Sequence, residues 1–173
     1  MKRIMGGKLK GKGIFMVETD IKITAADLYD YMLMHTYNSP SGIIGSTFGA
    51  LCIVAAFMTQ KWLMIIAGAV ILLYLPVTLY TKSKLQWTAN EAFQKPLHYV
   101  LNDEGVTVSQ GEVSESQAWE DMVKAVSTTR SIILYTSGRN ASIFPKGQLG
   151  DQTAALIEVI STHMPPAKVK IRS

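Results

Sequence analysis

The chain has 173 residues, of which 48% are hydrophobic and 17% are charged, and its mean hydropathy is +0.18. A soluble domain typically carries about 25% charged residues, so this composition excludes intrinsic disorder and favours a membrane protein. A single cysteine excludes an internal disulfide and therefore the class of small secreted domains held together by disulfides. The net charge of +4 is too small to indicate a nucleic-acid partner by itself.

The first 13 residues are rich in lysine and glycine, and we expect a flexible basic tail. Residues 6–13, GGKLKGKG, have the GxxxxGK spacing of a phosphate-binding loop. That motif needs Ser or Thr after its lysine, and Gly13 stands there instead. Contact with anionic lipid explains the tail better, because each lysine near a leaflet adds about 1 kcal/mol of attraction.

A strand and an amphipathic helix are expected over residues 14–41. Residues 14–23 alternate between apolar and polar types, as strands do. Thr24 and Asp27 have the spacing of a capping box, which predicts that a helix starts there and ends at the NSPSG sequence that follows.

Two runs without Asp, Glu, Lys or Arg follow, separated by Lys61. Their apolar cores, 42–60 and 62–80, each have 19 residues, and a helix of that length spans about 28 Å, close to the roughly 30 Å hydrocarbon core of a bilayer. A buried hairpin in a soluble bundle is the alternative, but neither run has the polar stripe that such helices show. We therefore predict a transmembrane hairpin with two spans.

The orientation of this hairpin follows from the flanking cations. Six Lys and Arg precede the spans and Lys82, Lys84 and Lys95 follow them, whereas the turn has Lys61 alone. The positive-inside rule then places both termini in the cytoplasm.

Within the first span, Gly45 and Gly49 form a GxxxG pair. We expect this pair to pack against the second span of the same hairpin, with a homodimer face as the alternative. Pro76 is expected either to kink the second span or to be accommodated by neighbouring groups. Because neither span contains an acidic or a basic residue, we do not expect ion transport through the hairpin.

Residues 81–173 are expected to form a cytoplasmic domain. A helical stripe up to Pro96 is followed from Leu97 by about six short strand-like runs, and a helix over 151–164 ends at Pro165 and Pro166. With strand 14–23 as a seventh member, these strands would form a small antiparallel barrel closed by the C-terminal helix. That order is typical of pleckstrin-homology-like (PH-like) domains. The predicted fold class is therefore an α+β membrane protein with a transmembrane hairpin and a PH-like antiparallel β-barrel.

Residues 101–149 contain an acidic-Gly turn, a strand bearing Ser and Glu, Trp119 followed by an acidic residue, the sequence LYTS, and a strand that ends at Pro145 and Lys146. After two early spans, this succession resembles the YcxB-like family of bacterial membrane proteins. The resemblance implies a PH-like cytoplasmic domain on a hairpin in the bacterial cell membrane, and it implies no activity. Gly147 stands where the family commonly has a basic residue, which weakens an anion site at that corner.

Sequence motifs of catalysis are absent: the chain has no GxSxG, HExxH, CxxC or GxGxxG. His35, His98 and His163 do not have the spacing of metal ligands. The carboxylates of the 112–121 stretch are expected to form a solvated face rather than a catalytic pair. We therefore expect no enzyme activity, no cofactor and no metal site.

Four basic residues come from successive strands or turns of the predicted barrel: Lys124, Arg130, Arg139 and Lys146. A barrel could gather them into one rim that binds an anionic headgroup or a protein partner through charge-assisted hydrogen bonds. The alternative is four dispersed solubilising charges.

The function expected from these features is a non-enzymatic, membrane-anchored module that binds a protein partner or associates with itself, with an open sheet edge as one means of binding. An anionic-lipid headgroup sensor is one alternative, and an accessory or immunity-type protein that modulates another membrane assembly is a second. A nucleic-acid partner is not expected, because the basic tail lacks interleaved aromatic residues.

Overall fold

The computed structural model describes residues 16–138 and 140–171. The expected basic tail, with its GxxxxGK spacing, and Arg139 lie outside the described residues. The first described element is strand β1 (Val17–Ile21), whose side chains are alternately buried and exposed. This alternation shows that one face of the strand lies on a core.

Helix α1 (Ala25–Tyr37) begins at the predicted capping box. The Thr24 Oγ1 atom accepts a hydrogen bond from the Asp27 backbone N–H at 3.2 Å, and Asp27 Oδ2 accepts one from the Thr24 N–H at 3.0 Å. The helix ends before Ser39, whose hydroxyl caps the next helix by accepting from the Gly42 N–H at 3.2 Å. A side chain at Gly42 would collide with the Thr36 carbonyl group, so glycine is required at this tight corner.

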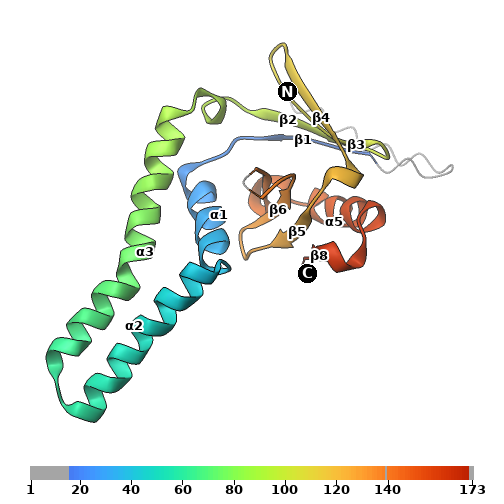
Figure 1. The fold of residues 1–173 in the computed structure, drawn as a ribbon. Coiled ribbons are helices and arrows are strands. Elements are labelled where there is room, and N and C mark those ends of the chain that lie inside the picture. The colour runs from blue at the N-terminus through green and yellow to red at the C-terminus, as the bar shows by residue number, and fades with distance from the viewer. Residues whose placement is uncertain (1–15, 139, 172–173) are drawn as a thin grey trace.

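Helices α2 (Pro40–Thr59) and α3 (Trp62–Ala89) form a long antiparallel hairpin that projects from the rest of the molecule (Figure 1). Both helices are long and apolar enough to cross a membrane. Only 17% and 11% of their most apolar windows are buried, in contrast to the core helices of soluble proteins. Helix α3 continues past Pro76 without a break, so residue 80, the expected end of the second span, lies inside a helix.

The first of two sheets consists of β1, β2 (Leu97–Leu101), β3 (Gly105–Gln110) and β4 (Val113–Ala118), in that spatial order and antiparallel throughout. A short 3-10 helix, η1 (Glu91–Phe93), leads from α3 into β2. β1 pairs along its whole length with β2, from Val17 opposite Leu101 to Ile21 opposite Leu97. The strand before the long hairpin therefore joins the sheet formed after it, a point that the sequence left open.

The second sheet has the order β7-β6-β5-β8. Its members are β5 (Lys124–Ser127), β6 (Ser131–Tyr135), β7 (Ala141–Pro145) and β8 (Val169–Lys170). The 3-10 helix η2 (Trp119–Asp121) connects the two sheets, and α4 (Lys146–Leu149), α5 (Gln152–His163) and η3 (Pro166–Lys168) follow β7. β8 was not expected; it pairs with β5 in parallel.

The expected closed barrel is wrong: the described strands form two open four-stranded sheets. Closure would require β4 to pair with β5, but the chain turns away through η2 and starts a separate ladder. The two sheets with α4 and α5 form the body of the molecule, from which the β3–β4 hairpin projects (Figure 1). Every β4 side chain except Gln117 is exposed.

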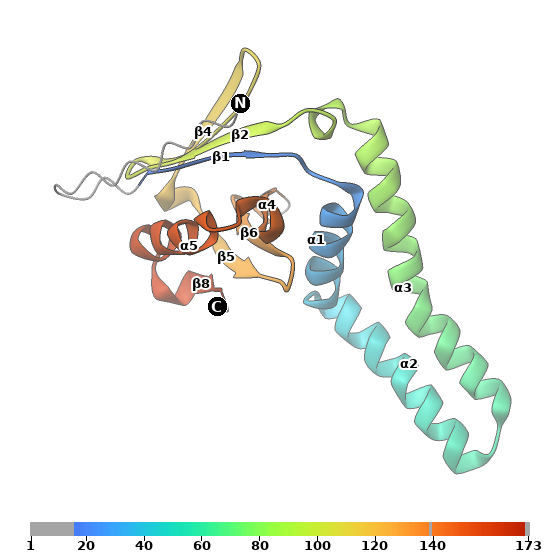
Figure 2. The same ribbon diagram turned by 180° about the vertical axis from the view of Figure 1, so that it is seen from behind.

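The main core lies between the two sheets and α5, which lies beside β1 in Figure 2. Its buried side chains include Leu101, Phe144, Leu156 and Ile160. All five residues of β6 are buried because both faces of this strand are covered. Ile132 and Leu134 face the main core, whereas Ile133 and Tyr135 pack with Tyr31 and Met34 of α1. Helix α1 therefore attaches the long hairpin to the body.

Candidate functional site

The basic residues of the predicted rim that the structure describes lie at two separate places. Lys124 is at the start of β5, where its Nζ atom lies 4.5 Å from the centroid of the Tyr135 ring. Arg130 and Lys146 lie beyond the other end of β5, about 10 Å away at the rise of a strand. The structure therefore brings two of these residues together and separates the third from them.

Arg130 and Lys146 line a shallow pocket of about 410 Å³ at the N-terminus of α1. The Lys146 ammonium donates a hydrogen bond to the Thr128 carbonyl oxygen at 2.9 Å. Asp27 lines the same pocket, and its carboxylate reduces the attraction that the two cations exert on an anion. Gly147, the departure from the family pattern, is also in this lining.

Tyr135 is at the centre of an aromatic cluster between β6 and α1. Its ring centroid lies 5.9 Å from that of Tyr31 and 6.1 Å from that of His35, and only 1% of the residue is exposed. Burial, with a smaller contribution from the charge of Tyr31, raises the pKa of Tyr135 to about 12. A phenol that stays neutral at such high pH serves as a packing group here, together with the Lys124 ammonium over its ring.

The two glycines of the GxxxG pair have different environments. Gly49 lies at the crossing of α2 and α3, where a Cβ atom would be 2.9 Å from Leu72 Cγ. A Cβ atom at Gly45 would meet nothing within 4 Å. The second close contact of this crossing comes from Gly68 of α3, which approaches the Gly49 carbonyl oxygen and Ile53.

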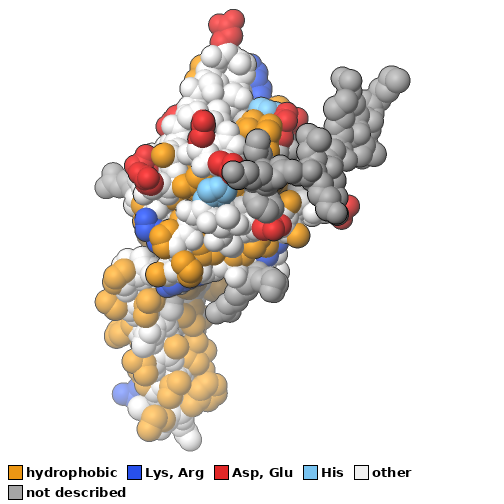
Figure 3. Space-filling view, turned by 90° about the vertical axis from the view of Figure 1, so that its right-hand side faces the viewer, with side chains coloured by type: hydrophobic (Ala, Val, Ile, Leu, Met, Phe, Trp, Pro, Cys, Tyr) orange, Lys and Arg blue, Asp and Glu red, His pale blue; other side chains and the backbone are white. Residues whose placement is uncertain are grey.

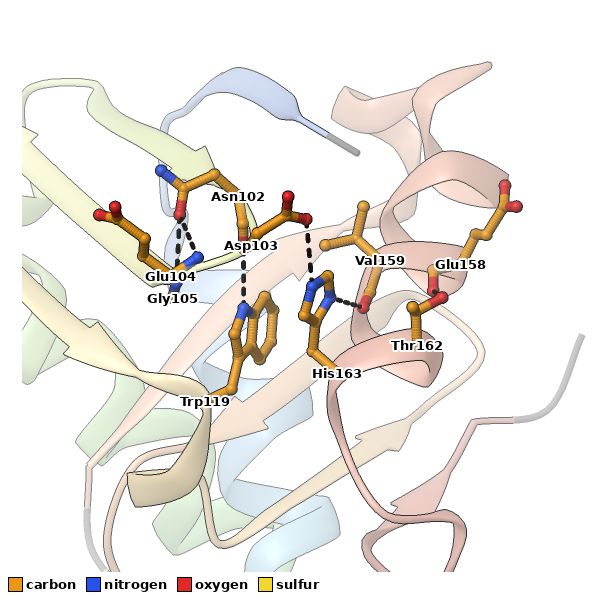
Figure 4. Close-up of polar contacts among 9 residues, drawn as sticks. All are labelled: Asn102, Asp103, Glu104, Gly105, Trp119, Glu158, Val159, Thr162 and His163. Carbon is orange, nitrogen blue, oxygen red and sulfur yellow. Dashed lines mark hydrogen bonds and ion pairs between the residues drawn. The ribbon is translucent and has the colours of Figure 1, made fainter. Parts of the chain in front are cut away.

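Trp119, His163 and the β2–β3 turn form a polar and aromatic contact between the two sheets and α5 (Figure 4). The Trp119 indole N–H donates to the Asn102 carbonyl oxygen at 2.8 Å, and the Trp119 ring stacks on His163 with 5.1 Å between centroids. His163 Nε2 lies 3.2 Å from Asp103 Oδ1, and Nδ1 lies 2.9 Å from the Val159 carbonyl oxygen. Each ring nitrogen of His163 therefore faces an oxygen that can accept a hydrogen bond.

The third histidine pairs with acidic residues of the neighbouring strand. His98 Nδ1 lies 2.8 Å from Asp20 Oδ1 and its Nε2 lies 3.4 Å from Glu18 Oε1. Across residues 16–138 and 140–171, no three His, Cys, Asp or Glu side chains are grouped as metal ligands would be.

Six of the 13 acidic residues lie in and around the β3–β4 hairpin. Residues 96–123 contain six Asp and Glu and no Lys or Arg, and all six acidic side chains are exposed. They are Asp103, Glu104, Glu112, Glu115, Glu120 and Asp121. On the face shown in Figure 3, acidic side chains occur at the tip of the projecting hairpin, and apolar ones cover α2 and α3.

Fold and surfaces together define an α+β protein that carries two long apolar helices and two small sheets. Residues 101–161, about a third of the chain, match the family model described as YcxB-like protein. This match confirms the family resemblance seen in the sequence, and it covers the segment from the end of β2 into α5. No curated protein and no solved structure matches the chain.

Proposed function

We propose that this protein is a non-enzymatic binding module of the PH-like type, anchored in a membrane by α2 and α3 and facing the cytoplasm. The observation that carries the proposal is the apolar surface of the long hairpin. Side chains such as Ile44, Phe57 and Met58 are 68%, 73% and 82% exposed. Apolar surface on this scale is stable in contact with lipid and not in water.

The distribution of cations supports the cytoplasmic side for the body. Lys61 is the one cation in the turn at the far end of the hairpin, whereas Lys82 and Lys84 lie in the last turns of α3, next to the body. Lys and Arg accumulate on the cytoplasmic side of membrane spans. Both ends of the described chain lie at the body end of the hairpin.

The order of the elements supports the PH-like type. Seven strands in two antiparallel ladders, followed by the helix α5 that packs into the core, have the chain order of such domains. A closed barrel is not needed to cover the core, because residues of both sheets and of α5 fill it.

A protein partner is favoured over an anionic lipid headgroup. The pocket of Arg130 and Lys146 lies at the N-terminus of α1, whereas α2 starts after the C-terminus of α1. Thirteen helical residues separate the two ends by about 20 Å. The basic pocket is therefore away from the point where the chain enters the proposed membrane, and Asp27 offsets its charge.

Membrane extraction and cysteine labelling test the anchor and its orientation. In a Cys52→Ser background, Lys61→Cys should react with a membrane-impermeant maleimide in intact cells, whereas Glu112→Cys should react only after the membrane is permeabilised. The protein should also stay with the membrane in alkaline carbonate. Release by carbonate contradicts the anchor, and labelling of Glu112→Cys in intact cells contradicts the orientation.

A further inference from the structure

Strand β4 is an open edge of the first sheet, since β3 is the only described strand with which it pairs. Gln110 and Val113 face each other across a two-residue turn that contains Gly111, whose φ is +62°. Such a turn closes with a hydrogen-bonded pair, and hydrogen-bonded and non-hydrogen-bonded pairs alternate from there. The backbone N–H and C=O groups of Ser114, Ser116 and Ala118 therefore point away from β3.

Apart from the charge of Glu115, this edge lacks the features that usually block strand addition. Proteins protect open edges with lysine, proline, bulges or a covering element. β4 has the sequence VSESQA, pairs with β3 in uninterrupted register, and is exposed at every position except Gln117. Ser114, Ser116 and Ala118, whose backbone groups point away from β3, have small side chains that stand on one face of the sheet. The edge is therefore open to a second backbone at the spacing of neighbouring strands.

We propose that β4 binds an extended, basic segment of a partner protein, which pairs with Ser114, Ser116 and Ala118 as a fifth strand of the first sheet. This inference rests on the proposed function as a binding module and is independent of the membrane anchor. Backbone hydrogen bonds supply the pairing in this mode of recognition, and side chains supply the choice of partner.

The charge around the edge is mainly acidic and favours one occupant; the nearby cations include Lys168, whose ammonium donates to the Met122 carbonyl oxygen at 2.8 Å, just after η2. Glu112 and Glu115 lie on the hairpin itself, and four more exposed carboxylates lie in the β2–β3 turn and in η2, at the Ala118 end of β4. A second copy of β4 would bring carboxylates opposite carboxylates, which disfavours pairing. An apolar strand would find one large apolar side chain, Val113, on β4. Lysine or arginine on the incoming strand matches the surface.

The test uses the full chain in zwitterionic detergent micelles and a capped peptide of alternating Lys and Val, six residues long like β4. Backbone amide signals report binding. We expect the amides of Ser114, Ser116 and Ala118 to shift and to become protected from hydrogen exchange. The same peptide with D-Val has equal charge but cannot form a regular strand, and we expect it not to bind.

The variant pair Ser116→Pro and Ser116→Ala separates strand pairing from side-chain effects. Both lose the hydroxyl contact with Thr107 Oγ1, at 2.8 Å, but only proline removes the outward N–H while leaving the pairing with β3 in place. We expect Ser116→Pro to weaken peptide binding about tenfold or more and Ser116→Ala to bind as the wild type does. Should Ser116→Pro not fold, the D-Val peptide tests strand pairing on the wild-type chain.

A second pair of variants tests the contribution of charge at the β4 edge to peptide binding. Glu115→Lys should weaken binding and reduce its salt dependence, whereas Glu158→Lys, a matched change at an exposed position of α5, should not. The proposal is overturned by no binding of the Lys–Val peptide, by equal binding of the D-Val peptide, or by equal binding of the Lys–Val peptide to Ser116→Pro and Ser116→Ala.

The same measurements detect two other occupants of the β4 edge. A dimer that Ser116→Pro converts to a monomer would show that a second copy covers β4 and would overturn the proposal. Protected Ser114 and Ser116 amides in the free monomer would show that the chain covers its own edge, with the same consequence. Neither result affects membrane insertion, so failure here is distinguishable from failure of the proposed anchor and orientation.

Discussion

Tyr135 shows how tertiary contacts give a side chain a role that its sequence context does not indicate. In the sequence it is the aromatic residue of the LYTS stretch, with nothing to mark it as special. In the structure its hydroxyl lies 3.5 Å from His35 Nδ1 and 3.8 Å from Met34 Sδ. It therefore ties β6 to α1, which are 100 residues apart in the chain.

The first prediction concerns the titration of this phenol. Because burial raises the pKa of Tyr135 to about 12, against about 10 for an unfolded tyrosine, the unfolded chain loses this proton first as the pH rises. The contribution of Tyr135 to stability should be complete below about pH 10 and should be lost between pH 10 and 12. Phenolate absorbance of the wild type minus that of Tyr135→Phe should show a midpoint near 12. A midpoint near 10 would contradict the burial of this ring.

At the scale of elements, the hairpin is held by a crossing that the GxxxG motif locates only in part. Gly49 lies at the crossing, whereas the other glycine of the motif, Gly45, has no neighbour within 4 Å of a Cβ position. The close approach is completed by Gly68 of α3. Spacing along one helix cannot reveal this, because the rotation of each helix about its axis is set by the helix against which it packs.

The second prediction compares two glycine substitutions in the hairpin. A Cβ atom at Gly68 would lie 2.8 Å from the Gly49 carbonyl oxygen and 2.7 Å from Ile53 Cγ1. Gly68→Ala should therefore force the helices apart and lower the free energy of unfolding by about 1–3 kcal/mol. Gly45→Ala, with open space around it, should leave stability equal or slightly higher because alanine favours helix. Unfolding in mixed micelles measures both.

Equal destabilisation by the two substitutions would contradict the observed crossing. A loss of self-association in Gly45→Ala, with stability unchanged, would instead favour the homodimer face that the sequence left as an alternative. Measuring the oligomeric state of both variants in the same detergent separates the two results.

At the scale of the whole molecule, the segments of the chain before and after the hairpin pack against each other. β1 lies before α2 and α3 and pairs with β2 after them. The Trp87 indole N–H near the end of α3 donates to the Ile23 carbonyl oxygen at 3.0 Å, which joins the segments that enter and leave the hairpin. The body is thus assembled from both sides of the hairpin, and residues 81–173 do not form a complete core.

The third prediction follows from this packing. Val17, Ile21 and Ile23 are at most 5% exposed, and burying each is worth about 1.5–3 kcal/mol. Their loss removes a large share of a typical stability of about 5–15 kcal/mol. A fragment of residues 81–173 should therefore aggregate or exchange its amides freely. Removal of residues 1–13, which precede β1, is the control and should leave the body folded. A stable, protected fragment would show that β1 is dispensable.

Much of the local structure is predictable because it depends on neighbours in the chain. The capping box of Thr24 and Asp27 starts α1 as predicted, since its hydrogen bonds join residues three apart. The strand runs after Leu97 appear as β2 to β7 for the same reason. β8 was missed because two residues carry too little pattern, and its pairing with β5 comes from distant parts of the chain.

By itself, the sequence determined the apolar hairpin, the succession of strands and the family resemblance, because these depend on composition, periodicity and order along the chain. Only the tertiary structure decided that the sheets stay open, that Arg130 and Lys146 lie apart from Lys124, and that β4 has a free edge. Those features depend on which strands find each other and where the chain turns away. Such pairings are long-range, and a pattern of neighbouring residues does not encode them.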